Sequence, residues 1–273
     1  MSDKLPKFKT PPVVELALGV QFECLDRLKA VHYGIWWKAI RDQFPKVEEH
    51  NALPPIVEPL DMAQTVEVKL RISDRPPPVR LWFLNEEATR LIQVQNDRFV
   101  YNWRKRGPSK EPYPSYDVLI EDFMKHLESF CDFVAEGKHG AFVPTMCEIT
   151  YVDHIVAGQG WKDHSEMHKL IAPVSPQYSD DFLPPMESLL FNTSYLFKKG
   201  AKALGRLRVN ANPAFRGKEK EPITVMNVGA FAPPIGPNIE GIRKALDRAH
   251  EWTVRGFTSM TPKEMHKVWG RTQ

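Results

Sequence analysis

The stretch at residues 144–155 reads PTMCEITYVDHI and carries a thiol, two carboxylates, a phenol and an imidazole within eight residues. Groups of these kinds perform general acid–base and nucleophilic catalysis in enzymes. Apolar and polar residues alternate here, however, which predicts a strand with Glu148 and His154 on one face and Tyr151 on the other. Glu148 and His154 are then about 20 Å apart, too far for a hydrogen bond. The motif is therefore no catalytic dyad or triad by itself.

Two interpretations of this strand stay open. In the structural one, Glu148 pairs with an arginine across the sheet and His154 bonds to a backbone group. In the functional one, Glu148, Tyr151 and His154 line a groove or the mouth of a cavity together with residues from other elements. We favour the structural interpretation, because isolated polar residues on a strand are weak evidence for a site.

Basic and aromatic residues gather on a predicted strand at 98–104, in the loop after it, and again near 198–208. The candidate binding residues in these segments are Arg98, Arg104, Lys105, Arg106, Arg206 and Arg208. Cationic grooves with aromatic platforms bind single-stranded nucleic acid. Alternation nevertheless puts Phe99, Tyr101 and Trp103 on the face opposite the arginines. We expect the aromatic face to be core and the arginine face to be solvated, which leaves nucleic-acid binding as an alternative.

Three histidines are also candidates for chemistry. His164 and His168 are four apart in WKDHSEMH, a spacing that would let a helix present both to a divalent metal. The pattern is H-x-E-x-H rather than the H-E-x-x-H of zinc proteases, and no third ligand is evident. A solvated surface turn is favoured, and we expect no metal. For His250, on a flank of the last helix, we expect a core histidine hydrogen-bonded to the sheet or a loop.

Motifs of several enzyme classes are absent from the sequence. The chain has no G-x-x-x-x-G-K-[ST] phosphate loop, no G-x-G-x-x-G after a strand and no G-x-S-x-G nucleophile elbow. No cysteine has a neighbouring histidine that would activate its thiol. We therefore expect no cofactor, and an enzyme is not the favoured interpretation.

Hydrophobic periodicity predicts the elements that must position these residues. Strands are expected at 13–23, 65–72, 79–85, 90–95, 98–104, 145–156, 188–198, 204–212 and 222–231, and helices at about 26–44, 116–134 and 238–260. A short helical segment is expected near 163–171 and a last helix begins with the capping box of Thr261 and Glu264. The stripe of the first helix includes Val31, Ile35 and Trp36, which leaves Trp37 exposed as a contact surface.

This order predicts an α+β protein built from tandem β-α-β(3-4)-α units, at 1–143 and 144–273, packed as one compact body. A one-sided apolar sheet must cover its face with amphipathic helices. We therefore expect a curved antiparallel sheet with long helices on one face. The order of each unit is that of helix-grip and TATA-binding-protein-like folds, an analogy that cannot settle function.

Composition limits the class of protein. The 273 residues are 42% hydrophobic and 26% charged, which predicts a packed core, and the net charge of +3 is too mild to indicate nucleic acid by itself. The N-terminus lacks the apolar region of a secretory signal, and no run of about 18 apolar residues could span a membrane. The chain has three cysteines at wide spacing, Cys24, Cys131 and Cys147. An odd number without a C-x-x-C pair predicts reduced thiols, as expected for a protein in the cytoplasm.

Several motifs together resemble one family: PPVVELALGVQFE, FPKVEEHNALPP, NWRK, YPSY, CEITYVDHI, GRLRVN and LDRAHEWTVRGFTSMT…VWGR. The chain is similar over nearly its whole length to a sporadically distributed family of bacterial cytoplasmic proteins of about 250 residues, to which no activity is assigned. Asp153 is a departure, since the family pattern leads us to expect asparagine there. The resemblance implies a bacterial cytoplasmic origin and transfers no residue roles.

Our leading expectation is a soluble bacterial binding or accessory protein that recognises a protein partner or forms a homodimer, as in a sporadic defence or immunity-type module. The first alternative is a nucleic-acid-binding protein that uses the basic strands and loops. The second is an enzyme or small-molecule binder with a cavity between sheet and helix, with Glu148, Tyr151 and His154 at its mouth.

Overall fold

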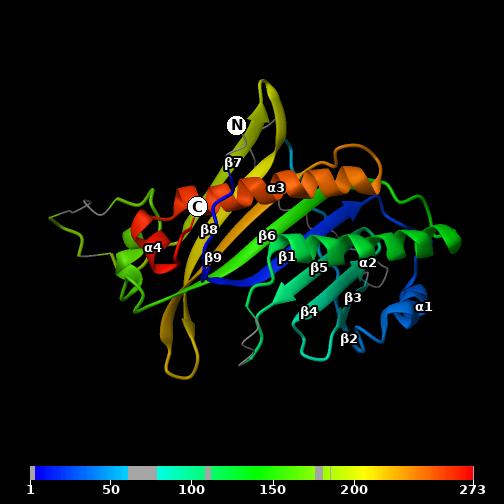
Figure 1. The fold of residues 1–273 in the computed structure, drawn as a ribbon, viewed down its shortest axis with the longest axis horizontal. Coiled ribbons are helices and arrows are strands. Elements are labelled where there is room, and N and C mark those ends of the chain that lie inside the picture. The colour runs from blue at the N-terminus through cyan, green and yellow to red at the C-terminus, as the bar shows by residue number, and fades with distance from the viewer. Residues whose placement is uncertain (1–3, 61–78, 108–111, 176–180, 185, 273) are drawn as a thin grey trace.

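The computed structural model describes residues 4–60, 79–107, 112–175, 181–184 and 186–272. Within them a single antiparallel sheet of nine strands has the order β2-β3-β4-β5-β1-β6-β9-β8-β7 (Figure 1). The strands are β1 Val13–Phe22, β2 Lys46–Asn51, β3 Val79–Leu84, β4 Arg90–Gln95, β5 Arg98–Arg104, β6 Pro144–Val156, β7 Phe191–Lys199, β8 Lys202–Arg216 and β9 Glu221–Ala232. The strand expected at 65–72 lies outside the described residues, and β2 was not predicted.

The centre of the sheet is the pair β1 and β6, the first strands of the two predicted units. On its outer side β1 pairs with β5, and β6 pairs with β9. Alternate residues of β1, Leu16, Leu18 and Val20, are fully buried on the face that the helices cover. The α+β class and the antiparallel sheet are therefore as expected, and the chain is brought together around these two central strands.

Helices cover one face of this sheet (Figure 1). They are α1 Ala30–Ile40, α2 Tyr116–Glu136, α3 Ile239–Met260 and α4 Lys263–Val268, with a 3₁₀ turn η1 at His164–Lys169. The predicted stripe of α2, which includes Leu119, Phe123 and Leu127, is buried against the sheet. The long helices α2 and α3 contact each other through the Arg243–Glu121 ion pair, at 2.8 Å. Removal of both apolar faces from water drives this packing.

The stripe predicted for α1 is right at Trp36 and wrong at Val31 and Ile35. Val31 and Ile35 are 71% and 61% exposed, whereas Tyr33, Trp36 and Ile40 are buried. The indole of Trp36 lies edge-on to the rings of Phe83, Phe99 and Phe130, a larger apolar contact than two branched aliphatic residues provide. Trp37 is half-buried and its indole N–H donates to the Phe44 carbonyl at 2.8 Å, so it is no exposed contact surface.

The start of α4 also differs from the prediction. The N-cap is Pro262 rather than Thr261, and no side chain caps the helix. The Thr261 hydroxyl instead donates to the Phe257 carbonyl at 2.7 Å and lies 2.9 Å from His266 Nε2. Thr261 thereby ends α3 and does not begin the last helix.

The second face of the sheet is crossed by residues 52–60, which we call the crossing segment. Because this segment runs over the strands, its backbone groups are satisfied by sheet side chains rather than by a ladder. Gln95 bonds to both backbone groups of Leu53, and Gln21 does the same for Ile56. Further along, the buried carboxylate of Glu58 meets Arg206. The face that we expected to be solvated is therefore partly covered.

Candidate functional site

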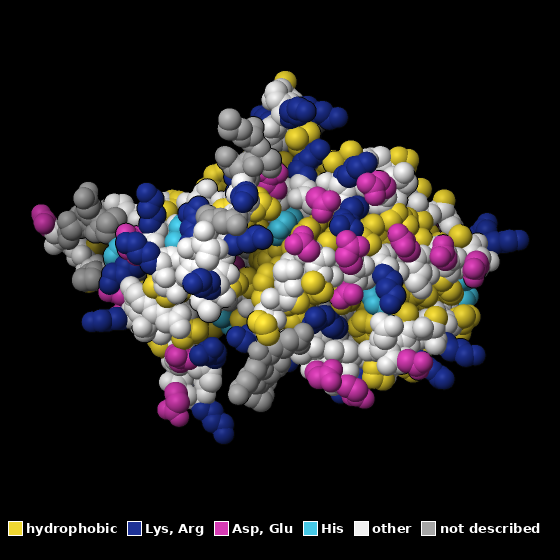
Figure 2. All heavy atoms as spheres, in the orientation of Figure 1, with side chains coloured by type: hydrophobic (Ala, Val, Ile, Leu, Met, Phe, Trp, Pro, Cys, Tyr) yellow, Lys and Arg dark blue, Asp and Glu magenta, His cyan; other side chains and the backbone are white. Residues whose placement is uncertain are grey.

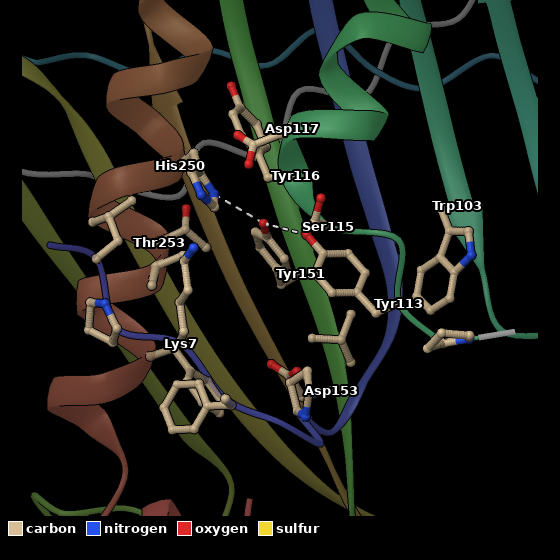
Figure 3. A pocket seen from close by; sticks show the side chains of 18 of the residues that line it. Lys7, Trp103, Tyr113, Ser115, Tyr116, Asp117, Tyr151, Asp153, His250 and Thr253 are labelled. Carbon is tan, nitrogen blue, oxygen red and sulfur yellow. Dashed lines mark hydrogen bonds between the residues drawn. The ribbon is translucent and has the colours of Figure 1, made fainter. Parts of the chain in front are cut away.

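A cavity of about 830 Å³ lies between the sheet and the helices α2 and α3 (Figure 3). Central strands form its floor, the start of α2 and one face of α3 form two walls, and residues 5–11 form a third. The side chains used below are Lys7, Phe8, Lys9, Trp103, Lys105, Tyr113, Tyr116, Asp117, Tyr151, Asp153, Asp247, His250, Val254 and Phe257. These residues are far apart in the sequence and meet only in the fold.

Strand and helix periodicity explain which side chains reach the cavity. On β6 the pleat sends Tyr151 and Asp153 to the helix-covered face, since both are buried while their neighbours are half-buried. On α3, Asp247, His250 and Val254 follow at spacings of three and four, which places them on one side of the helix.

A chain of hydrogen bonds crosses the cavity wall (Figure 3). The Tyr151 hydroxyl lies 3.0 Å from the Tyr113 hydroxyl and 3.0 Å from His250 Nδ1. Burial lowers the pKa of His250 to about 4, so this imidazole is neutral near pH 7. Burial likewise raises the pKa of Tyr113 and of Tyr151 far above their ordinary value. The chain is therefore electrically neutral and presents polar atoms without charge.

Tyr116 holds the imidazole of His250 in place. The two rings are stacked with centroids 3.9 Å apart and planes 4° from parallel. The Tyr116 hydroxyl donates to Asp247 Oδ1 at 2.8 Å, one turn before His250 on α3. These contacts hold the imidazole in place and so keep its Nδ1 atom directed at Tyr151.

Asp153 is the least satisfied group of the cavity. Its side chain is 1% exposed, and its Oδ1 atom has no hydrogen-bond partner in the part of the chain that the structure describes. Burial raises the pKa of this carboxyl to about 8. Figure 3 shows the carboxyl group directed into the cavity, below Tyr151. An unpaired buried polar group is costly, so most native structures provide a partner for it.

The third wall is formed by the N-terminal segment and held by the C-terminal one. Lys9 N–H donates to the Gly270 carbonyl at 3.1 Å, and Thr272 N–H donates to the Lys7 carbonyl at 2.8 Å. The Phe8 ring packs edge-on against Phe257 of α3, with centroids 5.7 Å apart. The wall is therefore built into the fold at both ends of the described chain.

The three candidate residues of β6 separate onto two faces. Tyr151 lines the cavity, whereas Glu148 and His154 lie on the face that carries the crossing segment. The expectation that all three surround one mouth is wrong, because the pleat alternates them. Glu148 Oε1 lies 3.9 Å from Arg98 Nε, as in the structural interpretation, and Gly19 leaves room for this carboxylate over β1. Burial raises the pKa of Glu148, and Arg98 lowers it in part.

The six candidate basic residues do not form one cationic surface. Arg98 donates to the Pro54 carbonyl at 2.9 Å. Arg206 bonds to Glu58 at 3.0 Å, and Arg208 Nη2 lies 2.5 Å from the same carboxylate. Three of the six thus hold the crossing segment, since a chain that runs over the strands needs side-chain partners.

The other three lie around the end of β5. Arg104 is buried, with its guanidinium 5.4 Å from the centre of the Trp82 ring, and only Lys105 and Arg106 are exposed. The expectation of a solvated arginine face is therefore wrong for Arg98, Arg104 and Arg206, which are 4%, 7% and 7% exposed.

Sequence reasoning missed two residues of the cavity and misplaced one. His250 does bond to the sheet, through Tyr151, but its position on a cavity wall was not foreseen. Asp153 carried a usable signal, since it is an acid on the apolar face of a strand. Tyr113 carried none, because only the fold brings it to Tyr151.

His164 of the H-x-E-x-H pattern is buried, so the expectation of a solvated surface turn is wrong at this residue. His164 Nε2 lies 3.0 Å from the Ile223 carbonyl, and the segment is a 3₁₀ turn, in which residues four apart do not share a face. Among the described residues, no three His, Cys, Asp or Glu side chains gather in a way that could hold a metal ion.

Neither a membrane-spanning helix among the described residues nor a matching protein family points to a function. Within the described ranges, none of the helices combines the length and the apolar character that crossing a bilayer requires. No protein-family model matches the chain, and no curated protein matches it either, so the case for a function rests on the geometry of the cavity.

Proposed function

We propose that the protein binds a small organic molecule in the cavity between the sheet and helices α2 and α3. The volume of about 830 Å³ falls within the range of ligand sites, which is about 300–1,000 Å³. The walls combine aromatic rings with a few polar groups that converge from different elements, as binding sites do. The observation that carries the proposal is Asp153, a buried carboxyl with an unpartnered oxygen that is directed into this space.

Apart from Asp153, whose pKa is about 8, the titratable groups inside the cavity are poorly matched to acid–base catalysis near neutrality, which favours binding. His250 has a pKa of about 4 and is a weak base, while the tyrosines titrate too high to act as acids or bases near neutrality. Burial raises the pKa of Cys131 and of Cys147 to about 12, so neither thiol is an activated nucleophile. These neutral groups suit recognition through hydrogen bonds.

The other expectations stay predictions. Nucleic-acid binding loses much of its support, because Arg98, Arg206 and Arg208 are occupied by the crossing segment. The helix-covered face also carries exposed acids along α2, and Figure 2 shows them as a row across the front of the molecule; they are Asp117, Glu121, Glu128, Asp132 and Glu136. Ligand binding is compatible with the remaining predictions, which are a division into units at 143/144, a helix-grip fold, a protein partner and a defence role.

A cavity-blocking variant tests the proposal. Val254 is a half-buried cavity residue of α3, and Val254→Trp fills part of the space from its rim. A thermal-shift screen of small molecules against wild type should yield compounds that raise the melting temperature. The same compounds should lose most of this effect on V254W.

The matched control is Lys244→Trp, which places the same side chain on the exposed side of α3. K244W should respond to the compounds as wild type does. Equal stabilisation of wild type and V254W would mean that the compounds bind elsewhere, and the proposal would be wrong.

A further inference from the structure

The charges around the cavity are unevenly distributed between rim and interior. Lys7, Lys9 and Lys105 are exposed, and Asp117 is exposed at the start of α2. Asp247 accepts from Tyr116 and lies 3.6 Å from Arg243. The titratable groups that face the interior are then Tyr113, Tyr116, Tyr151, His250 and Asp153, of which the first four bond or stack with one another.

Asp153 is the interior group that no described residue balances. It has no hydrogen bond and no ion pair within the described residues, and burial is the cause of its raised pKa, with no nearby cation to lower it. In the empty cavity this carboxyl is therefore protonated up to about pH 8. A bound group that supplies a positive N–H donor would satisfy the carboxylate form.

The lining around Asp153 suits such a group. Trp103 and Tyr113 present rings with centroids 5.4 Å apart on one side, and Phe257 lies on the other wall. Aromatic faces attract cations, and more strongly where water is excluded. A buried carboxylate beside aromatic rings therefore favours an organic cation over a neutral or anionic ligand of equal shape.

We propose that the cavity takes a small organic base whose protonated nitrogen donates to Asp153 while its apolar body packs against Trp103, Tyr113 and Phe257. This inference rests on the proposed ligand-binding function. A cationic amine that enters displaces the carboxyl proton to water, whereas a neutral amine takes that proton and becomes the cation. In both cases the O–H bond of Asp153 breaks and the bound state is a carboxylate–ammonium pair with no net charge.

Three probes with one common body test the charge preference: tryptamine, which is a cation, tryptophol, which is neutral, and indole-3-acetate, which is an anion. Calorimetric titration at neutral pH should give the tightest binding for tryptamine, by about tenfold or more over tryptophol, as expected for one paired charge in a partly dry site. Tryptamine affinity should rise by about tenfold per pH unit up to about pH 8 and then level, because binding displaces one proton below that pH.

Asp153→Asn removes the charge and keeps the shape. D153N should bind tryptophol as wild type does and lose the preference for tryptamine together with its pH dependence. Glu148→Gln is the matched control on the opposite face of the same strand, and E148Q should keep the preference. Since Asp153 is uncharged in the empty cavity at neutral pH, D153N should fold, which circular dichroism checks.

The outcomes separate the two proposals. Binding of tryptophol without any preference for tryptamine, or a preference that survives in D153N, would overturn the organic-base inference and leave ligand binding standing. Tightest binding of indole-3-acetate would also overturn it and would assign the ligand to the lysines of the rim. Failure of all three probes, together with an empty thermal-shift screen, would overturn both proposals.

Discussion

Asp153 and Tyr151 are two residues apart on β6, so the pleat directs both into the cavity, but their surroundings differ. The Tyr151 hydroxyl is bonded on both sides, to Tyr113 and to His250. The Asp153 carboxyl is buried and its Oδ1 atom has no hydrogen-bond partner among the described residues. At the residue scale, the candidate site is thus a neutral hydrogen-bond chain beside one carboxyl whose partner we expect to be a ligand.

The raised pKa of Asp153 has a consequence for stability. Its folded-state pKa is about 8, whereas an aspartate in an unfolded chain titrates near pH 3.9. Between these limits the folded state binds more protons, so the stability contribution of this group is lost as pH rises through the window. Each pH unit there costs wild type up to about 1.4 kcal/mol relative to D153N, which does not titrate.

Urea unfolding of wild type and D153N at about pH 5 and about pH 8 measures this difference. We expect D153N to gain on wild type as pH rises. Comparison of the two proteins at each pH cancels the contributions of other titrating groups. A stability difference that stays constant over this range would contradict the unpaired state of Asp153.

At the scale of elements, the crossing segment couples parts of the sheet that are far apart. It contacts β1, β4 and β5 through Gln21, Gln95 and Arg98, and β8 through Arg206 and Arg208. Near its end lies the buried Glu58 carboxylate, whose side chain is 0% exposed between two arginines, and the Pro59 carbonyl accepts from Arg206 at 2.8 Å. The segment therefore keeps the arginines of the second face occupied.

Loss of the Glu58 charge should destabilise the protein. Glu58→Gln leaves Arg206 buried without its counter-ion, for which we expect a loss of about 3 kcal/mol in the free energy of unfolding. The matched control is Glu86→Gln, which breaks an exposed pair with Lys46 at 2.7 Å and should cost less than about 1 kcal/mol. Chemical unfolding of both variants measures the two losses in free energy of unfolding. Equal losses for E58Q and E86Q would show that Glu58 does not anchor the crossing segment.

Local periodicity predicted the elements that have one apolar face and failed for those that have two. The stripe of α2 and the alternation of β6 each allow one orientation, so the burial of Phe123 and of Tyr151 followed from the sequence. Helix α1 carries apolar residues on two sides, and the tertiary contacts of Trp36 with Phe83, Phe99 and Phe130 decide that Trp36 is buried while Ile35 is exposed. The crossing segment has no hydrophobic periodicity that would predict its position. Its partners Gln21 and Arg206 are distant in the chain, so only the fold brings them to it. The cavity could not be predicted from the sequence for the same reason, because its lining residues come from segments that are far apart in the chain.

At the scale of the whole molecule, the two faces of the sheet have different roles. The helix-covered face holds the cavity and carries the row of acids seen in Figure 2, while the other face carries the crossing segment. Both ends of the described chain meet at the cavity. There the Phe8 ring packs against Phe257 and His266, and the backbone of Phe8 forms an antiparallel β-bridge with Arg271. Integrity of the cavity thus depends on contacts between the two ends of the described sequence.

Removal of the Phe8 ring tests this dependence. Phe8→Ala should lower the free energy of unfolding by about 2 kcal/mol, less than for a fully buried phenylalanine because Phe8 is half-buried. It should also weaken binding of any compound found in the screen, since it opens one wall. Val31→Ala, at a site that is 71% exposed, should change neither quantity. Wild-type stability and binding in F8A would mean that the N-terminal wall is not part of the site.

A crystal structure of the protein with tryptamine bound tests the assignment of the ligand site directly. We predict electron density for one molecule between the sheet, α2 and α3, with its amine nitrogen about 3 Å from Asp153 Oδ1 and its indole against Trp103, Tyr113 or Phe257. Density for the probe outside this cavity, with the cavity itself unchanged, would show that this space is not the ligand site.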